Sequence, residues 1–414
     1  MIIHTVTSSD TIYSISKQYG VTATRILIDN SLNPSKKLVP GQSLIINRSI
    51  KTYLVKGGDT IEQIAKYNNI SVLSLLQNNP RLLREKLMPS QILNISYNKE
   101  DTKSIAVAAY TGSAPINTVE AYLPNVSMLL VQNIAHIVGS NVLVSKVADD
   151  YIALAKKYHT LPIMVLECIN EQGKYDENCI LKVLESPNET ERLINNIIAR
   201  AEENGFAGVE INAPGINTAD KYKFVDMFLA LSGMCKDKNL YCASPYIPIS
   251  VVDSNDENLF DISDYVPLWN YIWDSKDLPT HMSPLNKIEE TLNTETMRKA
   301  NYKLLLGIPT FAIDYWKSRN GYEKSSVNSD EVVYKNNAQI LFDNNTHTPY
   351  AKYNEVNSKN QIEHTVQYED ARSISDKFDI LDKYDLYGVN IMSLEYSAPV
   401  LWQILSQRYN ILKF

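Results

Sequence analysis

The chain has 414 residues, 44% of them hydrophobic, which predicts a folded globular protein of two or three domains. Its formal net charge of −7, without clusters of Lys and Arg interleaved with aromatic residues, argues against a nucleic acid as partner. No apolar run is long enough to span a bilayer, and the first residues, MIIHTVTSSDTIYS, lack the basic and apolar regions of a secretory signal peptide. We therefore expect no membrane span and no signal peptide.

The first hundred residues contain an internal repeat. The segment Asp10-Thr11-Ile12 recurs as Asp59-Thr60-Ile61, at an offset of 49 residues. The same offset relates Ile15 to Ile64, Leu27 to Leu76, Asn30 to Asn79, and Pro40-x-Gln42 to Pro89-x-Gln91. A constant offset means that two units share one core without insertions. We predict a first module, residues 1–49, and a second module, residues 50–97.

Each module is predicted to run strand, helix, helix, strand. The short strands HTVT and TYLVK precede helical spacing in IYSISKQYG and IEQIAKYNN, and a second helix, a Pro-x-Gln turn and a closing strand follow. Asp10 and Asp59 stand just before the first helix, where a carboxylate can accept from free backbone N–H groups. We predict that these two aspartates are the helix N-caps.

Both modules resemble LysM domains, which bind N-acetylglucosamine-containing glycans such as peptidoglycan and chitin. The resemblance implies a shallow groove between the strand-to-helix turn and the loop after the second helix. The candidate glycan-binding residues are Ser9, Asp10, Thr11, Ile12, Asn30 and Asn33 in the first module, and Gly58, Asp59, Thr60, Ile61, Asn79 and Arg81 in the second. The alternative for the individual residues is structural, with the aspartates as caps and the asparagines as turn formers.

After a polar linker, NKEDTKS (residues 98–104), apolar runs alternate with helical stretches. The eight runs are IAVAAY, SMLLVQN, IMVLECI, GVEINA, LYCASPYI, VPLWNYIW, KLLLGIPTF and YGVNIMSL. Buried strands that alternate with helices indicate a parallel sheet. Eight of them within residues 105–414 predict an α/β fold, a (β/α)8 TIM barrel. An open doubly wound sheet is the alternative, but no glycine-rich phosphate turn follows the first run.

Three segments of this region resemble strands of family 18 glycoside hydrolases, in particular the LysM-carrying branch of bacterial spores. GFAGVEINAP (205–214) resembles the fourth strand, VPLWNYIW (266–273) the sixth and LLLGIPTFAIDYW (304–316) the seventh. The resemblance implies substrate-assisted hydrolysis of N-acetylated glycans. In that reaction a glutamic acid protonates the leaving oxygen, the substrate acetamido oxygen attacks, and an aspartate steadies the acetamido group. It also implies that the polar segment 318–370 is a small α+β insertion.

The catalytic signature of that family is degraded in this chain. Its four positions are Ala207, Glu210, Asn212 and Pro214. The general acid is therefore a proline, which has no proton to donate, and an asparagine replaces the aspartate. Tyr271 matches a family tyrosine, but Ile272 stands where an aspartate is expected and Met392 where a tryptophan floors the sugar site. We predict that the barrel is not catalytic.

A relocated acid is the alternative that would keep the protein an enzyme. Glu210 faces inward but is about 13 Å of extended strand deeper than position 214. Other acids near expected strand ends are Glu167, Asp274, Asp314 and Glu395. Because such acids are more often solvated or paired, the non-catalytic hypothesis is preferred. The expected barrel-mouth residues are Glu210, Asn212, Tyr271, Trp273 and Met392.

No metal, cofactor or disulfide is predicted. The four cysteines form no CxxC pair, so buried free thiols are expected at Cys168, Cys179, Cys235 and Cys242. The six histidines have no spacing typical of a metal site.

Together these residues and resemblances predict a spore-associated protein that binds peptidoglycan, or a related glycan, through two LysM modules and a non-catalytic barrel. The first alternative is an active N-acetylglucosaminidase that cleaves peptidoglycan with a relocated acid. The second is a scaffold that docks other spore-envelope proteins. The resemblance implies synthesis in the mother cell and assembly onto the spore envelope, in the cortex or coat.

Overall fold

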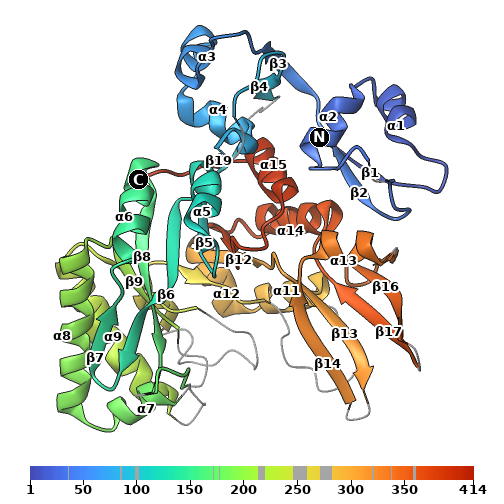
Figure 1. Cartoon of the computed structure of the whole chain (residues 1–414). Helices are drawn as coiled ribbons and strands as arrows, with labels where there is room; N and C mark the ends of the chain where they lie inside the picture. Colours follow the sequence, from blue (N-terminus) through green and yellow to red (C-terminus); the bar gives the residue numbers. More distant parts are fainter. Residues whose placement is uncertain are drawn as a thin grey trace.

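The computed structural model describes residues 1–35, 37–83, 86–97, 102–170, 172–176, 178–212, 220–245, 259–270, 282–318, 321–336, 338–357 and 360–414. Two small N-terminal modules lie against a barrel that carries an insertion on one side (Figure 1). Within these ranges, every helix is too short or too polar to cross a bilayer.

The two modules have the predicted order of elements. The first contains β1 (Ile2–Thr5), α1 (Ile12–Tyr19), α2 (Ala23–Asp29) and β2 (Ser43–Ile46). The second contains β3 (Ser49–Leu54), α3 (Ile61–Tyr67), α4 (Val72–Asn78), the 3-10 helix η1 (Pro80–Leu83) and β4 (Ile92–Tyr97). In each module the two strands pair antiparallel.

The helix caps differ from the prediction by one residue. Thr11 is the N-cap of α1 and Thr60 that of α3, and each hydroxyl accepts from a backbone N–H of its helix. Asp10 instead closes the preceding turn, where it accepts from the backbone N–H of Thr7 at 2.7 Å, and Asp59 closes the corresponding turn. Threonine and aspartate both serve as N-caps. In each module an aspartate and a threonine are adjacent; the aspartate accepts hydrogen bonds within the turn, and the threonine caps the helix.

Eight parallel strands form the barrel. They are β5 (Ser104–Tyr110), β6 (Met128–Val138), β8 (Leu161–Cys168), β9 (Gly208–Asn212), β10 (Tyr241–Ala243), β11 (Val266–Pro267), β12 (Leu304–Ile308) and β18 (Gly388–Ile391). Their order is β10-β9-β8-β6-β5-β18-β12-β11. A parallel bridge between Ala243 and Tyr265 links β10 to the residue before β11. The ring is thus nearly closed, and the predicted barrel is confirmed.

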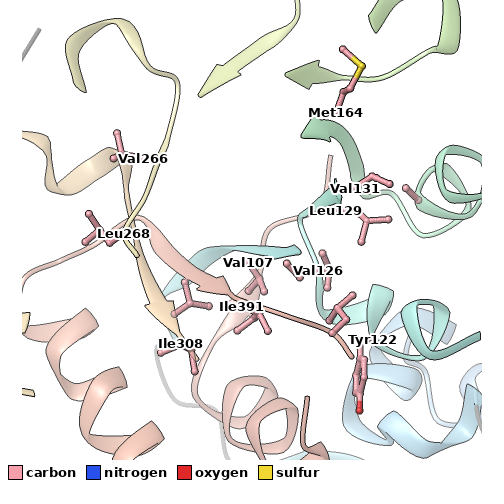
Figure 2. Packing of buried hydrophobic residues seen from close by; sticks show 14 of the residues in the cluster. Val107, Tyr122, Val126, Leu129, Val131, Met164, Val266, Leu268, Ile308 and Ile391 are labelled. Atoms are coloured by element: carbon pink, nitrogen blue, oxygen red, sulfur yellow. The ribbon is translucent and has the colours of Figure 1, made fainter. Parts of the chain in front are cut away.

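Helices surround the strands and pack on their outward side chains. The helices are α5 (Ile116–Tyr122), η2 (Leu123–Asn125), α6 (Ala148–Lys157), α7 (Cys179–Leu184), α8 (Pro187–Asn204), α9 (Lys221–Asp237), α11 (Leu285–Leu292), α12 (Glu295–Ala300), η3 (Asn301–Lys303), α14 (Ala371–Lys383) and α15 (Pro399–Arg408). Val107, Leu129 and Ile391 belong to the outer cluster shown in Figure 2. Their neighbours Ala108 and Leu130 fill the barrel interior instead. This alternation along each strand decides which polar residues can face the interior.

Strand β6 is longer than the apolar run that predicts it. Its pairing with β8 is irregular between Val131 and Ala135, and it continues into a hairpin with β7 (Asn141–Val144). Asn133 in the irregular segment has φ +61°, a left-handed conformation that asparagine tolerates. A bulge re-aims the side chains that follow it, and the register beyond it sets His136 opposite Glu167.

The predicted α+β insertion is present between β12 and β18 and begins earlier than expected. It contains β13 (Ala312–Ser318), β14 (Gly321–Val327), α13 (Ser329–Lys335), β15 (Gln339–Asp343), β16 (Thr348–Asn357) and β17 (Asn360–Gln367). The strands form an antiparallel sheet in the order β14-β13-β17-β16-β15. The seventh barrel strand therefore ends at Ile308, and AIDYW belongs to the insertion. Pro309 follows directly, and proline cannot donate to a strand ladder.

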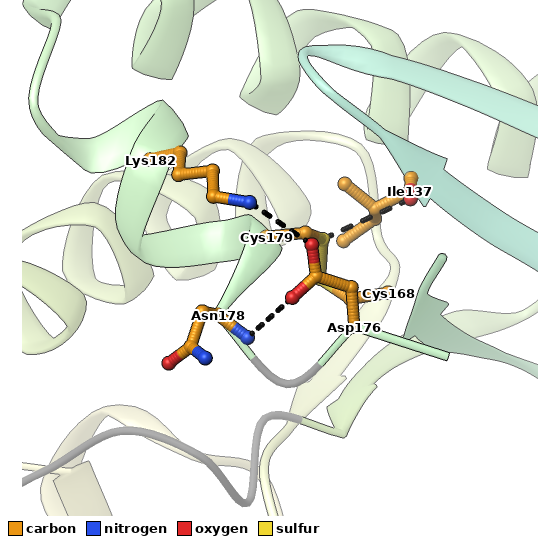
Figure 3. The surroundings of a disulfide bond; sticks show 6 residues. All are labelled: Ile137, Cys168, Asp176, Asn178, Cys179 and Lys182. Carbon is orange, nitrogen blue, oxygen red and sulfur yellow. Dashed lines mark hydrogen bonds and ion pairs between the residues drawn. A yellow bond between two sulfur atoms is a disulfide. The ribbon is translucent and has the colours of Figure 1, made fainter. Parts of the chain in front are cut away.

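A disulfide joins Cys168 and Cys179, so the prediction of free thiols was wrong for this pair (Figure 3). Cys168 ends β8 and Cys179 begins α7. The loop between them folds back, and the backbone N–H of Asp176 donates to the carbonyl of Cys168 at 3.1 Å. The spacing of these two cysteines matches no short motif, so the sequence did not predict the pair. They meet because of the fold of the loop between them. Cys235 and Cys242 are buried and free, as predicted.

The second module shares a hydrophobic core with the barrel. Leu75, Leu82 and Ile95 belong to the same buried cluster as the outward side chains of the barrel strands. Helix η1 packs on α5, and the Gln77 side chain donates to the carbonyl of Pro124 at 2.9 Å. The second module is thus part of the folded body of the barrel.

The first module has its own core and contacts the rest of the chain through both apolar and polar groups, since its Ile45 belongs to the shared barrel cluster. That core consists of Val6, Ile15, Ile26, Leu44 and Ile46. The Asn47 amide donates to Gln403 of α15 at 2.9 Å, and the Arg372 guanidinium of α14 donates to the carbonyl of Gly41 at 3.0 Å. Figure 1 shows this module, in dark blue, beside α14 and α15.

Candidate functional site

A row of three polar side chains crosses the mouth of the barrel. The register pairs His136 of β6 with Glu167 of β8, and Glu167 with Asn212 of β9. Residues paired in neighbouring strands point to the same face. Val165, two residues before Glu167, belongs to the interior cluster, so the row faces inward. It lies at the carboxyl ends of the strands, where barrels of this kind carry their chemistry.

Glu167 has the properties of a proton donor. Burial raises the pKa of its carboxyl group, and the opposing effects of the His136 charge and of hydrogen bonds to Asn212 and Gln132 are smaller. The residue is nevertheless partly exposed. An accessible carboxylic acid with a raised pKa is a candidate general acid.

Glu210 lies one layer below this row and is fully buried. It pairs in register with Val165, which places it two residues, or about 7 Å, deeper than Glu167. The hydroxyl groups of Tyr110 and Tyr265 donate to its two carboxylate oxygens. Glu210 is therefore held beneath the mouth as part of the barrel interior.

Replacing Glu210 with glutamine is expected to flatten the pH dependence of stability. Burial raises the pKa of Glu210 from 4.5 to about 7, the Tyr110 and Tyr265 hydrogen bonds oppose this shift, and the Glu167 charge adds to it. Because the folded-state pKa is the higher one, folding takes up a proton. The stabilisation is full below pH 4.5 and is lost as the pH rises to about 7, a change of at most about 3 kcal/mol. Thermal unfolding of both proteins from pH 4.5 to 8 measures it, and parallel curves would contradict the expectation.

Some buried polar atoms of the described residues, at the mouth and below it, have no hydrogen-bond partner. Among the residues that the structure describes, they include Oδ1 of Asn212, Nδ1 of His136 and both amide atoms of Asn390. Asn390 is fully buried on β18 and pairs with Ala108 of the interior cluster. An unsatisfied buried polar group costs about 1–3 kcal/mol. These atoms are sealed from solvent, so they belong to the barrel interior rather than to an open ligand surface.

One of the alternative acids lies away from the barrel mouth. Asp314 was expected at the end of a barrel strand, but it lies in the insertion strand β13. There it accepts from the Tyr353 hydroxyl at 2.6 Å and contacts Nδ1 of His364 at 3.0 Å. Glu395 is exposed after β18 and accepts from the backbone N–H of Ser113 at 3.3 Å. Glu395 therefore lies at the rim of the mouth, whereas Glu167 faces inward and has a raised pKa.

The other predicted barrel residues contribute little to the described site. Ala207 precedes β9, and its backbone N–H donates to the carbonyl of Pro162. Met392 follows β18 and is half-buried. Pro214, Tyr271, Ile272, Trp273 and Asp274 lie outside the described residues. In the part of the chain with a described structure, no group of three His, Cys, Asp or Glu side chains could hold a metal ion.

The sequence did not single out Tyr110, Tyr265, His136 or Asn390. Tyr110 ends the run IAVAAY, in step with the interior residues Ala106 and Ala108, and this alternation could have placed it inside the barrel. His136 follows the irregular segment of β6, so no regular alternation predicts its direction.

In the modules, the two candidate asparagines use their amides within the fold. The Asn30 amide donates to the carbonyls of Ile26 and Ile45 and accepts from the Ile45 N–H. Asn79 makes the equivalent three bonds with Leu75 and Asn94. Each amide ties the end of the second helix to the closing strand, which favours the structural role for both asparagines.

The remaining candidate groove residues lie at the strand-to-helix turns or, for Asn33 and Arg81, after the second helix of each module. Ser9, Thr11, Asn33, Gly58 and Thr60 are exposed. Ile12 packs on the core of the first module, and Ile61 packs on the cluster shared by the second module and the barrel. The Arg81 side chain lies outside the described residues.

Comparison with known proteins identifies both parts of the chain. The model of the glycosyl hydrolases family 18 matches residues 132–396, and the LysM domain model matches residues 4–47 and 53–96. The cortical fragment-lytic enzyme of Bacillus anthracis is 30% identical, with 99% of each chain covered. The putative sporulation-specific glycosylase YdhD of Bacillus subtilis is 23% identical over 95% of each chain. The solved structure of the Bacillus cereus spore cortex-lytic enzyme SleL superposes with a TM-score of 0.78 at 22% identity, covering 100% of this chain and 99% of that one.

Proposed function

Because the chain belongs to glycosyl hydrolase family 18 and carries two LysM domains, we propose that it binds the peptidoglycan of the spore without hydrolysing it. Relatives named for cortical fragment lysis and for sporulation support the association with the spore. In this proposal residues 1–49 and 50–97 supply glycan binding and residues 105–414 form the barrel. Synthesis in the mother cell and a place in the cortex or coat belong to the same proposal.

The state of the barrel mouth carries the non-catalytic part of this proposal. The sequence resemblance implies that Pro214 occupies the family's general acid position and that Asn212 replaces the stabilising aspartate. The retained acid, Glu210, is buried beneath Tyr110 and Tyr265. Loss of a general acid alone typically costs about 10²- to 10⁴-fold in rate, and loss of an electrostatic stabiliser adds a comparable factor.

Hydrolysis through Glu167 is the second candidate function, and one observation favours it. Glu167 is an accessible carboxyl with a raised pKa, and it lies beside Asn212, whose amide could orient a substrate acetamido group. Strand geometry separates the Cα atoms of Glu167 and Glu210 by about 8 Å, and a carboxylate-pair mechanism would need both carboxyl groups at the scissile bond. Burial of Glu210 away from the mouth argues against its use as the second acid.

Co-sedimentation with purified spore peptidoglycan tests the proposed binding. The full chain is expected in the pellet and is expected to be displaced by soluble chito-oligosaccharides, because the LysM domains would recognise N-acetylglucosamine units. The two modules should bind a repeating polymer more tightly than a short oligosaccharide, since the second contact is intramolecular. Recovery of the protein in the supernatant at all polymer concentrations would refute the proposed function.

A further inference from the structure

A cavity of about 350 Å³ lies between the first module and the barrel. Its walls include Ile12, Asn33 and Lys37 from the module, Val333 from the insertion, and Tyr368 and Asp370 from the segment that leads into α14. The first module thus turns a face toward the barrel rather than toward open solvent.

The second module turns the same face into a cavity of its own. Positions 30, 42 and 44 line the first cavity, and positions 79, 91 and 93, at the offset of 49 residues, line a second cavity of about 590 Å³. The opposite wall of that second cavity is α2 of the first module. The same face of each module therefore lines a cavity, opposite the barrel domain in the first module and opposite α2 in the second.

The contacts beside the first cavity hold its two walls at a fixed distance. The Arg372 guanidinium donates to the carbonyl of Gly41, and the backbone N–H of Ala371 donates to the Ser43 hydroxyl at 3.2 Å. Gly41 has φ +88°, and a Cβ there would lie 2.6 Å from the carbonyl oxygen of Ile340. Glycine is needed at this point because the module and the insertion approach so closely.

The cavity lining suits a neutral ligand with both apolar and hydrogen-bonding groups. Glu369 accepts two hydrogen bonds from Lys377, and Asp370 accepts from Arg372, so both carboxylates are neutralised. Lys37 is the one Lys or Arg among the described lining residues. Partly exposed apolar side chains such as Leu38 and Val400 provide surface for the carbon face of a sugar. The volume falls within the range of about 300–1,000 Å³ that is typical of small-molecule sites.

We infer that the barrel domain completes the saccharide site of the first module, so that an N-acetylated sugar unit is enclosed between the two. This inference rests on the proposed glycan binding and deepens it. The module supplies one wall, and α13 with the segment before α14 supplies the other. The first module then binds sugar differently from the second, although their sequences repeat.

The Ser329→Trp substitution tests this inference from the barrel side. Ser329 is partly exposed at the start of α13 and lines the cavity. Tetra-N-acetylchitotetraose is titrated calorimetrically into the full chain. The indole is expected to fill the cavity and to weaken one class of site at least about tenfold, a loss of about 1.4 kcal/mol. Ala398→Trp, which fills the cavity from the α15 side, is expected to act alike.

Ser326→Trp is the matched control, because Ser326 is exposed on β14 and does not line the cavity. All three variants should keep the wild-type unfolding temperature. Unchanged binding by Ser329→Trp and Ala398→Trp would overturn the inference and leave the proposed function standing. Tighter binding would also overturn it, since the barrel would then obstruct the module. Failure of the wild-type chain to bind any saccharide would instead refute the proposed function.

Discussion

Replacing Lys377 with methionine is expected to lower the free energy of unfolding by about 3–5 kcal/mol, because it leaves a buried carboxylate without its partner. The Lys377 side chain in α14 is 0% exposed and that of Glu369 is 4% exposed. The ammonium group donates to both carboxylate oxygens, at 2.9 and 2.8 Å. Chemical denaturation of the two proteins at pH 7 measures the difference.

The effect of this substitution should also depend on pH. Burial raises the pKa of Glu369, although Lys377 opposes the shift. Without Lys377 the carboxyl group can avoid its penalty by taking up a proton, so the destabilisation should be smaller at pH 5 than at pH 8. The double variant with Glu369→Gln should recover much of the loss.

Lys287→Met is the control for the buried pair. Lys287 pairs with Glu290, and both side chains are 62% exposed. A surface pair of this kind contributes at most about 1 kcal/mol. Equal losses from Lys287→Met and Lys377→Met would show that burial of the pair has no special role.

The joint replacement of Asp10 and Asp59 with alanine is expected to reduce retention on peptidoglycan by about 10²-fold or more, whereas either single change should have a much smaller effect. Asp10 accepts hydrogen bonds from the backbone and hydroxyl groups of Thr7, both at 2.7 Å. Asp59 accepts from the backbone N–H of Lys56 and the hydroxyl of Tyr53, at 2.8 and 2.9 Å. Each carboxylate therefore fixes the turn that borders a predicted glycan groove.

The informative result is how much more retention the double variant loses than either single variant. When one module is weakened, the other still holds the chain on the polymer at high effective concentration. Co-sedimentation at increasing amounts of peptidoglycan gives the affinities. Glu290→Ala removes an exposed carboxylate far from the modules in sequence and serves as the control. If one single variant lost as much binding as the double variant and the other lost none, only one module would bind.

The modules and the barrel could be predicted from the sequence because their signals are local and repeated. The offset of 49 residues aligns both modules, and the eight apolar runs correspond to the eight barrel strands. The predictions were wrong where two adjacent residues could both cap a helix, or where one apolar run contains the end of a strand. Thr11 and Asp10 are both good caps, and Pro309 divides a run that reads as one strand.

The site depends on contacts that local patterns do not specify. Cys168 and Cys179 meet only because the loop after β8 folds back. His136 reaches the mouth only because β6 is irregular before it. The cavity between the first module and the barrel has no sequence signature, since its walls come from segments hundreds of residues apart.

The central claim is that this family 18 protein binds the glycan and does not cleave it. Mass spectrometry of the soluble fraction after long incubation with purified spore peptidoglycan tests it most directly. We expect no saccharide fragments above the background measured without the protein, while the protein stays bound to the polymer. Release of fragments by the wild-type chain would contradict this account, and their loss in Glu167→Gln would identify Glu167 as the relocated acid.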